Sequence, residues 1–229
     1  MEITTYTGHH CPDAKGVCVV IDVLRAFTTA AFAFASGAQE IVFVHSIEEA
    51  FAKFKKDPTL LLMGEKGGQK IEGFHFENSP SEIQAAQLAG KRLVQRTSSG
   101  TQGVVGCRHA SHLLVASFVV AEATLARIIQ LQPKHVSLIV TGQKNGEEDA
   151  ALADYLTRKL TGQPIELESI LDRVRLSPSA HRMQAGEIAY PAGKKDLDLA
   201  LQIDHFPFAM EVFKQNEELI GRMVYPKIF

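Results

Sequence analysis

Short apolar segments rich in β-branched residues alternate with longer segments of helical periodicity along most of the chain. The segments that predict strands are 17–22, 40–44, 59–63, 92–96 and 135–140. The segments that predict helices are 25–37, about 46–57, 79–90, 119–131 and 147–162. Serine caps and glycine stops mark several boundaries, as at Ser46 and Gly37. From about residue 177 the pattern is less regular.

Strands separated by helices predict an α/β fold in which a largely parallel sheet is covered on both faces. We expect a layered α/β/α arrangement, built as one unit or as two α/β halves with right-handed crossovers. No low-complexity linker interrupts the chain. The prediction is therefore a single α/β domain over residues 1–229, with a C-terminal subdomain from about residue 163 as the alternative division.

Several predicted strands end abruptly in polar or glycine-rich residues. These strand ends are Asp22 and the segments 64–68, 97–101 and 141–142. In open parallel sheets, ligands bind beyond the carboxyl ends of the strands. The four loops are therefore expected to converge on one crevice, with Asp22 facing it.

The loop 97–101, Thr-Ser-Ser-Gly-Thr, has the clearest chemistry. Its hydroxyls, its glycine and the amides of a following helix together suit a phosphate oxygen. Serine and threonine also cap helices when no ligand is present, so both interpretations stay open.

Carboxylates at the strand ends suggest a metal. Asp22 and Glu65 are hard oxygen ligands, which suit Mg²⁺ when water and substrate complete its coordination. The alternative for Asp22 is a helix N-cap or an ion pair with Arg25. Glu148 and Asp149 lie in the first turn of a predicted helix, where the helix dipole alone explains acidic residues.

The amino-acid composition limits the classes of molecule that the protein is expected to bind. The 229 residues are 45% hydrophobic, enough for a sizeable core, and their net charge of −2 gives no basic field for nucleic acid or an anionic membrane. No apolar run is long enough to span a bilayer. Cys11, Cys18 and Cys107 lack disulfide or metal-site spacing and are expected to be reduced. We expect a cytoplasmic protein with a small anionic partner, and a homo-oligomer if the phenylalanine-rich segment 27–34 is partly exposed.

Other phosphate-binding motifs are absent from the sequence. There is no GxxxxGK[ST] loop, and residues 100–106 lack the GxGxxG spacing of dinucleotide sites. Leu24 occupies the place of the second aspartate of aspartate-nucleophile phosphatases, and no cysteine is followed by arginine six residues later.

Three blocks of the chain resemble the 2-phosphosulfolactate phosphatases, magnesium-dependent hydrolases of the coenzyme M route. The blocks are VVIDVLRA at 19–26, GEKGGQKIEGFHFENSP at 64–80 and TSSGT at 97–101, in the family's order. A weaker block is GEEDAALADYL at 146–156. The family usually has Thr-Thr-Asn-Gly-Thr in the third block, so Ser99 replaces an amide that could both donate and accept hydrogen bonds.

The resemblance implies a magnesium-dependent phosphatase that hydrolyses 2-phosphosulfolactate to sulfolactate and phosphate. In this interpretation Asp22 and Glu65 hold Mg²⁺, and Arg25 binds phosphate or a second anion. Asp149 or Glu148 acts as general acid or as an outer ligand of the metal. The expected neutral donors to the substrate are Asn78, Ser79, Thr97, Ser98, Ser99, Gly100 and Thr101.

Two further hypotheses remain at this stage: a phosphatase for another small phosphorylated carboxylic acid, and a non-catalytic anion-binding module. Attack by water and attack by an enzyme nucleophile are both open. Lys66, Arg96 and Arg108 are equal candidates for binding the second anionic group of the substrate.

Overall fold

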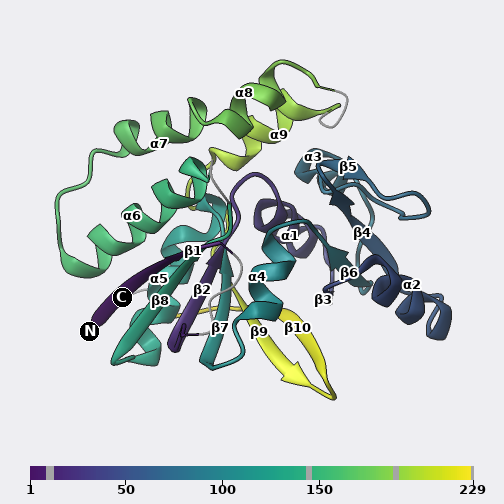
Figure 1. Cartoon of the computed structure of the whole chain (residues 1–229), viewed down its shortest axis with the longest axis horizontal. Helices are drawn as coiled ribbons and strands as arrows, with labels where there is room; N and C mark the ends of the chain where they lie inside the picture. Colours follow the sequence, from purple (N-terminus) through teal and green to yellow (C-terminus); the bar gives the residue numbers. More distant parts are fainter. Residues whose placement is uncertain (9–12, 143–145, 188–190, 228–229) are drawn as a thin grey trace.

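The computed structural model describes residues 1–8, 13–142, 146–187 and 191–227, which form a ten-stranded sheet covered by helices (Figure 1). The strands are β1 (Glu2–Thr7), β2 (Gly16–Ile21), β3 (Glu40–Phe43), β4 (Leu61–Lys66), β5 (Gln69–Lys70), β6 (Arg92–Arg96), β7 (Ala110–Ala116), β8 (His135–Val140), β9 (Ala209–Gln215) and β10 (Glu218–Val224). The helices are α1 (Ala26–Ala35), α2 (Ile47–Lys56), α3 (Pro80–Gln84), α4 (Gly100–Gly106), α5 (Ala121–Leu131), α6 (Glu147–Thr161), α7 (Leu167–Arg175), α8 (Pro178–Gln184) and α9 (Gly193–Ala200), with the 3₁₀ turn η1 (Phe118–Val120) before α5.

The sheet consists of two parallel blocks joined by an antiparallel hairpin, with the short strand β5 paired antiparallel to β4 at one edge. The first block has the order β1, β8, β2, β7, and the second has the order β3, β6, β4. The hairpin β9–β10 lies between them and pairs antiparallel with β7 on one side and β3 on the other. The predicted layered α/β fold with a largely parallel sheet is confirmed.

The sheet curls around α1 and α4. Four strands separate β2 from β6 in the sheet order, which would place them about 25 Å apart in a flat sheet. However, Gln95 on β6 donates from Nε2 to the carbonyl oxygen of Ala26 at the start of α1, at 2.9 Å. The accumulated twist of the strands therefore brings the two blocks to face each other, with α1 and α4 between them (Figure 1).

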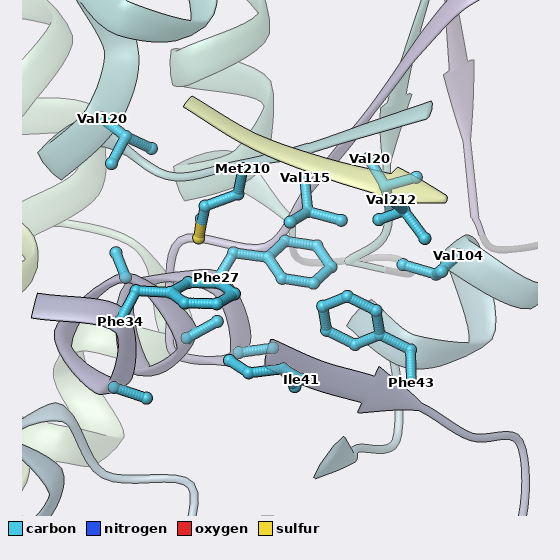
Figure 2. Packing of buried hydrophobic residues seen from close by; sticks show 14 of the residues in the cluster. Val20, Phe27, Phe34, Ile41, Phe43, Val104, Val115, Val120, Met210 and Val212 are labelled. Atoms are coloured by element: carbon cyan, nitrogen blue, oxygen red, sulfur yellow. The ribbon is translucent and has the colours of Figure 1, made fainter. Parts of the chain in front are cut away.

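Helix α1 fills the space between the blocks, and its residues 26–34 are all buried. Figure 2 shows Phe27 and Phe34 between side chains of both blocks, among them Val115 and Ile41. The rings of Phe27 and Phe43 meet edge to face, with their centroids 6.1 Å apart. Because the segment 27–34 is buried within one chain, it offers no surface to a second copy.

Other helices cover the outer faces of the blocks. Apolar side chains of α5, α6, α7, α8 and α9 form one cluster on the first block, and α2 contributes to a smaller cluster on the second. Alternation along β2 explains the layering: Val19 and Ile21 face the outer cluster, whereas Cys18 and Val20 face the inner one. Helix α6 ends at Gly162, as predicted, in the left-handed conformation.

Three predictions about the elements need correction. The helix expected over 79–90 begins at its Ser79 cap but ends at Gln84, because the chain turns to place Leu88 in the inner core. The region after residue 177 is regular, since it forms α8, α9 and the central hairpin β9–β10. The strand expected over 59–63 is β4, which begins at Leu61 and continues to Lys66, and the sequence pattern did not indicate strands β1, β5 and β7 or helix α7.

The structure also bears on the expectations about the cysteines and about membrane-spanning segments. Cys18 and Cys107 are buried, whereas Cys11 lies outside the described residues. Within the described residues, no helix combines the length and the apolar composition needed to span a membrane.

Candidate functional site

Asp22 lies at the carboxyl end of β2, between the first turns of two helices. Its Oδ1 accepts a hydrogen bond from the backbone nitrogen of Ala26 at 3.0 Å. Gly100, the first residue of α4, is so close that a Cβ there would come within 2.8 Å of Asp22 Oδ2. The capping role that was the alternative for Asp22 is therefore part of its geometry, while its second oxygen faces the loop after β6.

Glu65, near the end of β4, ties two of the predicted loops together. Its Oε2 accepts hydrogen bonds from the backbone nitrogen of Gly68 at 2.6 Å and from Ser98 Oγ at 3.0 Å. Its Oε1 accepts one from the backbone nitrogen of Ser98 at 2.5 Å. Glu65 is also close enough to Asp22 for their charges to repel. The ends of β2 and β4 therefore come together although they belong to different blocks.

Asp149 fixes the backbone beside Asp22. In the first turn of α6, its carboxylate accepts hydrogen bonds from the backbone nitrogens of Val23 at 2.7 Å and Gly142 at 3.0 Å. This contact joins the ends of β2 and β8, and it does more than complement the helix dipole. Both oxygens of Asp149 are thus occupied by the protein backbone.

Glu148, its neighbour in α6, has an oxygen without a partner. The side chain is 4% exposed, and its Oε2 is buried with no hydrogen bond to any described residue. Its charge interacts with those of Asp22 and Asp149. A buried carboxylate oxygen left without a partner is costly, so it is available to a proton or a cation.

Asp22, Glu65, Glu148 and Asp149 form a carboxylate cluster, in which burial shifts the protonation of Asp22, Glu148 and Asp149 toward the neutral form. Burial raises the pKa of Asp22 to about 7, and repulsion from Glu65 and Glu148 acts in the same direction. Burial, then repulsion from Asp22 and Glu148, raises the pKa of Asp149 well above its usual value. Burial also raises the pKa of Glu148. Such shifts are common at sites that move protons or bind cations.

Some polar groups of the hydroxyl loop 97–101 form hydrogen bonds within the loop. Thr97 and Thr101 each donate a backbone N–H to the other's hydroxyl, at 2.9 and 3.0 Å. Ser98 is engaged with Glu65, while Ser99 is half-exposed. Of the five predicted donors in this loop, the two threonines therefore hold its shape, the backbone of Gly100 donates to Asp22, and Ser99 is better placed for a ligand.

Arg25 is buried between two carboxylates. Its Nη2 donates to Glu77 Oε1 and its Nη1 to Asp196 Oδ2, both at 2.8 Å. Ser79, another predicted donor, caps α3 and donates to Asp196 Oδ1 at 2.8 Å. The amide of Asn78 is buried nearby, with Oδ1 3.4 Å from Gln95 Nε2. Local sequence patterns carried no sign of Glu77 and Asp196, because both contacts join residues far apart in the chain.

The three basic side chains proposed to bind the second anionic group of the substrate lie at different places in the fold. Arg108 precedes β7, whose last residue pairs with the last residue of β2, so Arg108 lies at the opposite end of the sheet from Asp22. Arg96 donates from Nη1 to the carbonyl oxygen of Glu65 at 2.8 Å, and Lys66 is exposed at the same strand end. Only Arg96 and Lys66 of these three remain near the carboxylate cluster.

The carboxylate cluster fits magnesium, although not as a complete metal cage. Among the residues the structure describes, no three His, Cys, Asp or Glu side chains gather into a metal-binding group. Mg²⁺ is commonly held by one or two carboxylates and completed by water and substrate phosphate. The repulsion that Glu65 and Glu148 exert on Asp22 would be relieved by a divalent cation bound at this place.

The chain is similar over most of its length to enzymes that hydrolyse phosphate monoesters. Residues 3–214 match the family model described as 2-phosphosulpholactate phosphatase. The chain belongs to the 2-phosphosulfolactate phosphatase family, as its sequence blocks had indicated.

Individual relatives support this membership. A protein of Bacillus subtilis strain 168 is 34% identical over 185 residues, which are 80% of this chain and 81% of the relative. A protein of Thermus thermophilus is 34% identical, over 87% of this chain and 81% of its own length. A protein of Synechococcus sp. strain CC9605 is 40% identical, over 65% of this chain and 62% of its own length. Each is named "Probable 2-phosphosulfolactate phosphatase".

Proposed function

We propose that this protein is a magnesium-dependent phosphatase that hydrolyses 2-phosphosulfolactate to sulfolactate and phosphate. The observation that carries the proposal is the carboxylate cluster at the strand ends, beside the hydroxyl loop 97–101, in a chain of this family. Hydrolysis transfers the phosphoryl group to water, breaks the ester P–O bond and returns a proton to the leaving alkoxide. The site must therefore neutralise phosphate charge and manage one proton.

In this proposal Asp22 and Glu65, whose charges are close enough to interact, would be the residues that hold Mg²⁺. When bound, Mg²⁺ would neutralise charge on the phosphate and lower the pKa of a coordinated water. Ser99 and Asn78 orient the phosphate by donating hydrogen bonds.

Glu148 is the better candidate of the two α6 carboxylates for handling the proton. Both oxygens of Asp149 accept hydrogen bonds from backbone N–H groups. In contrast, Glu148 Oε2 has no hydrogen-bond partner among the described residues, and burial raises the pKa of Glu148. A protonated Glu148 can donate to the leaving alkoxide as a general acid.

A substrate panel tests the substrate class. We expect phosphate release from 2-phosphosulfolactate in Mg²⁺ to exceed that from phospholactate and phosphoglycolate, measured as kcat/KM at one pH. A sulfonate preference supports the proposal, because only the sulfonate group distinguishes 2-phosphosulfolactate from 2-phospholactate. Faster turnover of a phosphorylated carboxylic acid would replace the proposed substrate by that acid.

The non-catalytic alternative gives a different pattern. A binding module would show a ligand-induced rise in Tm but no phosphate release from any member of the panel. The raised pKa values of Asp22 and Asp149 favour catalysis over simple anion binding, since carboxyl groups perturbed by burial are common at sites that move protons or bind cations.

A further inference from the structure

Asp196 of α9 is fully buried and gathers donors from two distant parts of the chain. Its Oδ2 accepts from Arg25 Nη1 at 2.8 Å. Its Oδ1 accepts from Ser79 Oγ at 2.8 Å, from the backbone nitrogen of Ser81 at 3.0 Å and from Ser81 Oγ at 2.6 Å. One carboxylate of the C-terminal helices therefore joins the turn after β2 to the start of α3.

Packing alone does not explain a charge at this position. Burying a carboxylate is costly unless hydrogen bonds and an opposite charge compensate for it, and apolar residues of similar size often stabilise as well. Leu197 and Ala200 of the same helix already supply apolar contacts to the outer cluster. The specific donors around Asp196 point to a requirement for geometry.

The same contact limits what Arg25 can do. Its guanidinium, with 2% of the side chain exposed, already pairs with two carboxylates, Glu77 and Asp196. The attraction of Arg25 for a substrate anion is correspondingly reduced. Arg25 is also the residue before α1, and the next residue, Ala26, donates its N–H to Asp22. Fixing Arg25 therefore fixes the turn that orients Asp22.

We propose that Asp196 is a positioning residue for the active site, which holds Arg25 and the start of α3 so that Asp22 and Asn78 point at the substrate. This inference rests on the proposed function. It assigns to the C-terminal helices a share in catalysis, and it makes Arg25 a structural support of Asp22 rather than a clamp for the substrate's anion.

The test compares Asp196→Asn with Asp198→Asn, a matched control two residues further along the same helix on its exposed side. For Asp196→Asn we expect kcat to fall by about 10²-fold, the usual cost of a displacement of about 1 Å, with KM changed less than about threefold. Asp198→Asn should match the wild type. An unchanged kcat for Asp196→Asn, or a raised KM with kcat intact, would overturn the inference.

A second measurement is independent of activity. Amide hydrogen exchange of residues 23–28 should be faster in Asp196→Asn than in Asp198→Asn, because the turn after β2 loses its anchor. Equal exchange in the two variants would contradict the proposed link.

If the wild type releases no phosphate, the proposed function fails, and the exchange data still decide whether Asp196 holds the turn. If Asp196→Asn does not fold, Ser81→Ala, which removes one donor to Asp196 Oδ1, should show the same changes to a smaller extent, and wild-type values for it would refute the inference.

Discussion

Replacing Asp22 by asparagine is expected to lower kcat for phosphate release by about 10³-fold without destabilising the fold. A bound divalent cation contributes several kcal/mol of transition-state stabilisation, and about 1.4 kcal/mol corresponds to a factor of ten in rate. Asparagine keeps an oxygen to accept the hydrogen bond from Ala26. It removes the negative charge that Glu65 and Glu148 repel.

Steady-state kinetics and thermal unfolding of the same preparations check this result. Asp198→Asn serves as the control for loss of a carboxylate outside the site. A variant at position 22 that keeps more than about a tenth of wild-type kcat would remove Asp22 from the chemistry. A large drop in Tm would instead show that Asp22 is mainly a helix cap.

The stability of the metal-free protein is expected to fall as the pH rises from about 4 to about 8. Burial raises the pKa of Asp22 from its usual 3.8 to about 7 in the folded chain. Between these values the folded state holds a proton that the unfolded state has released, so the free energy of unfolding decreases with increasing pH. The decrease attributable to Asp22 is on the order of 4 kcal/mol, since each pKa unit corresponds to about 1.4 kcal/mol. Burial raises the pKa of Asp149 and Glu148 as well, which adds to the same trend.

Urea unfolding in chelator at a series of pH values measures this dependence. The Asp22→Asn variant should show a shallower slope, because its site titrates one group fewer. Wild-type protein whose stability rises between pH 5 and pH 8 would contradict the assignment of a neutral Asp22 to the folded state.

Local sequence signals predicted most of the fold. The cap at Ser46 holds, because a serine hydroxyl and the N–H of Glu49 are neighbours in any such helix start. The carboxyl ends of β2, β6 and β8 were predicted because apolar runs stop abruptly at polar residues, whereas β4 continues through Gly64 and Glu65 to Lys66. The predicted end of α3, at residue 90, lies beyond its actual end at Gln84. After Gln84 the chain turns and buries Leu88 in the inner core, and such long-range packing is not visible in a local sequence pattern.

The contacts that organise the site were harder to predict. The position of Asp149 indicates a helix-dipole role and the family resemblance implies a general acid or outer ligand of the metal, yet in the structure Asp149 accepts from the N–H of Val23, 126 residues away in the sequence. No local pattern indicates the role of Asp196, because its partners Arg25 and Ser79 are 171 and 117 residues away. Side-chain pairs of this kind depend on the curl of the sheet, which local periodicity does not encode.

Titrating Mg²⁺ into chelator-treated protein while following phosphate release from 2-phosphosulfolactate shows whether the carboxylate cluster around Asp22 is a magnesium-dependent catalytic site. We expect a rate that starts at background and rises to saturation with Mg²⁺, and that stays at background in Asp22→Asn. A full rate in excess chelator, or saturation by Mg²⁺ that Asp22→Asn leaves unchanged, would contradict this expectation.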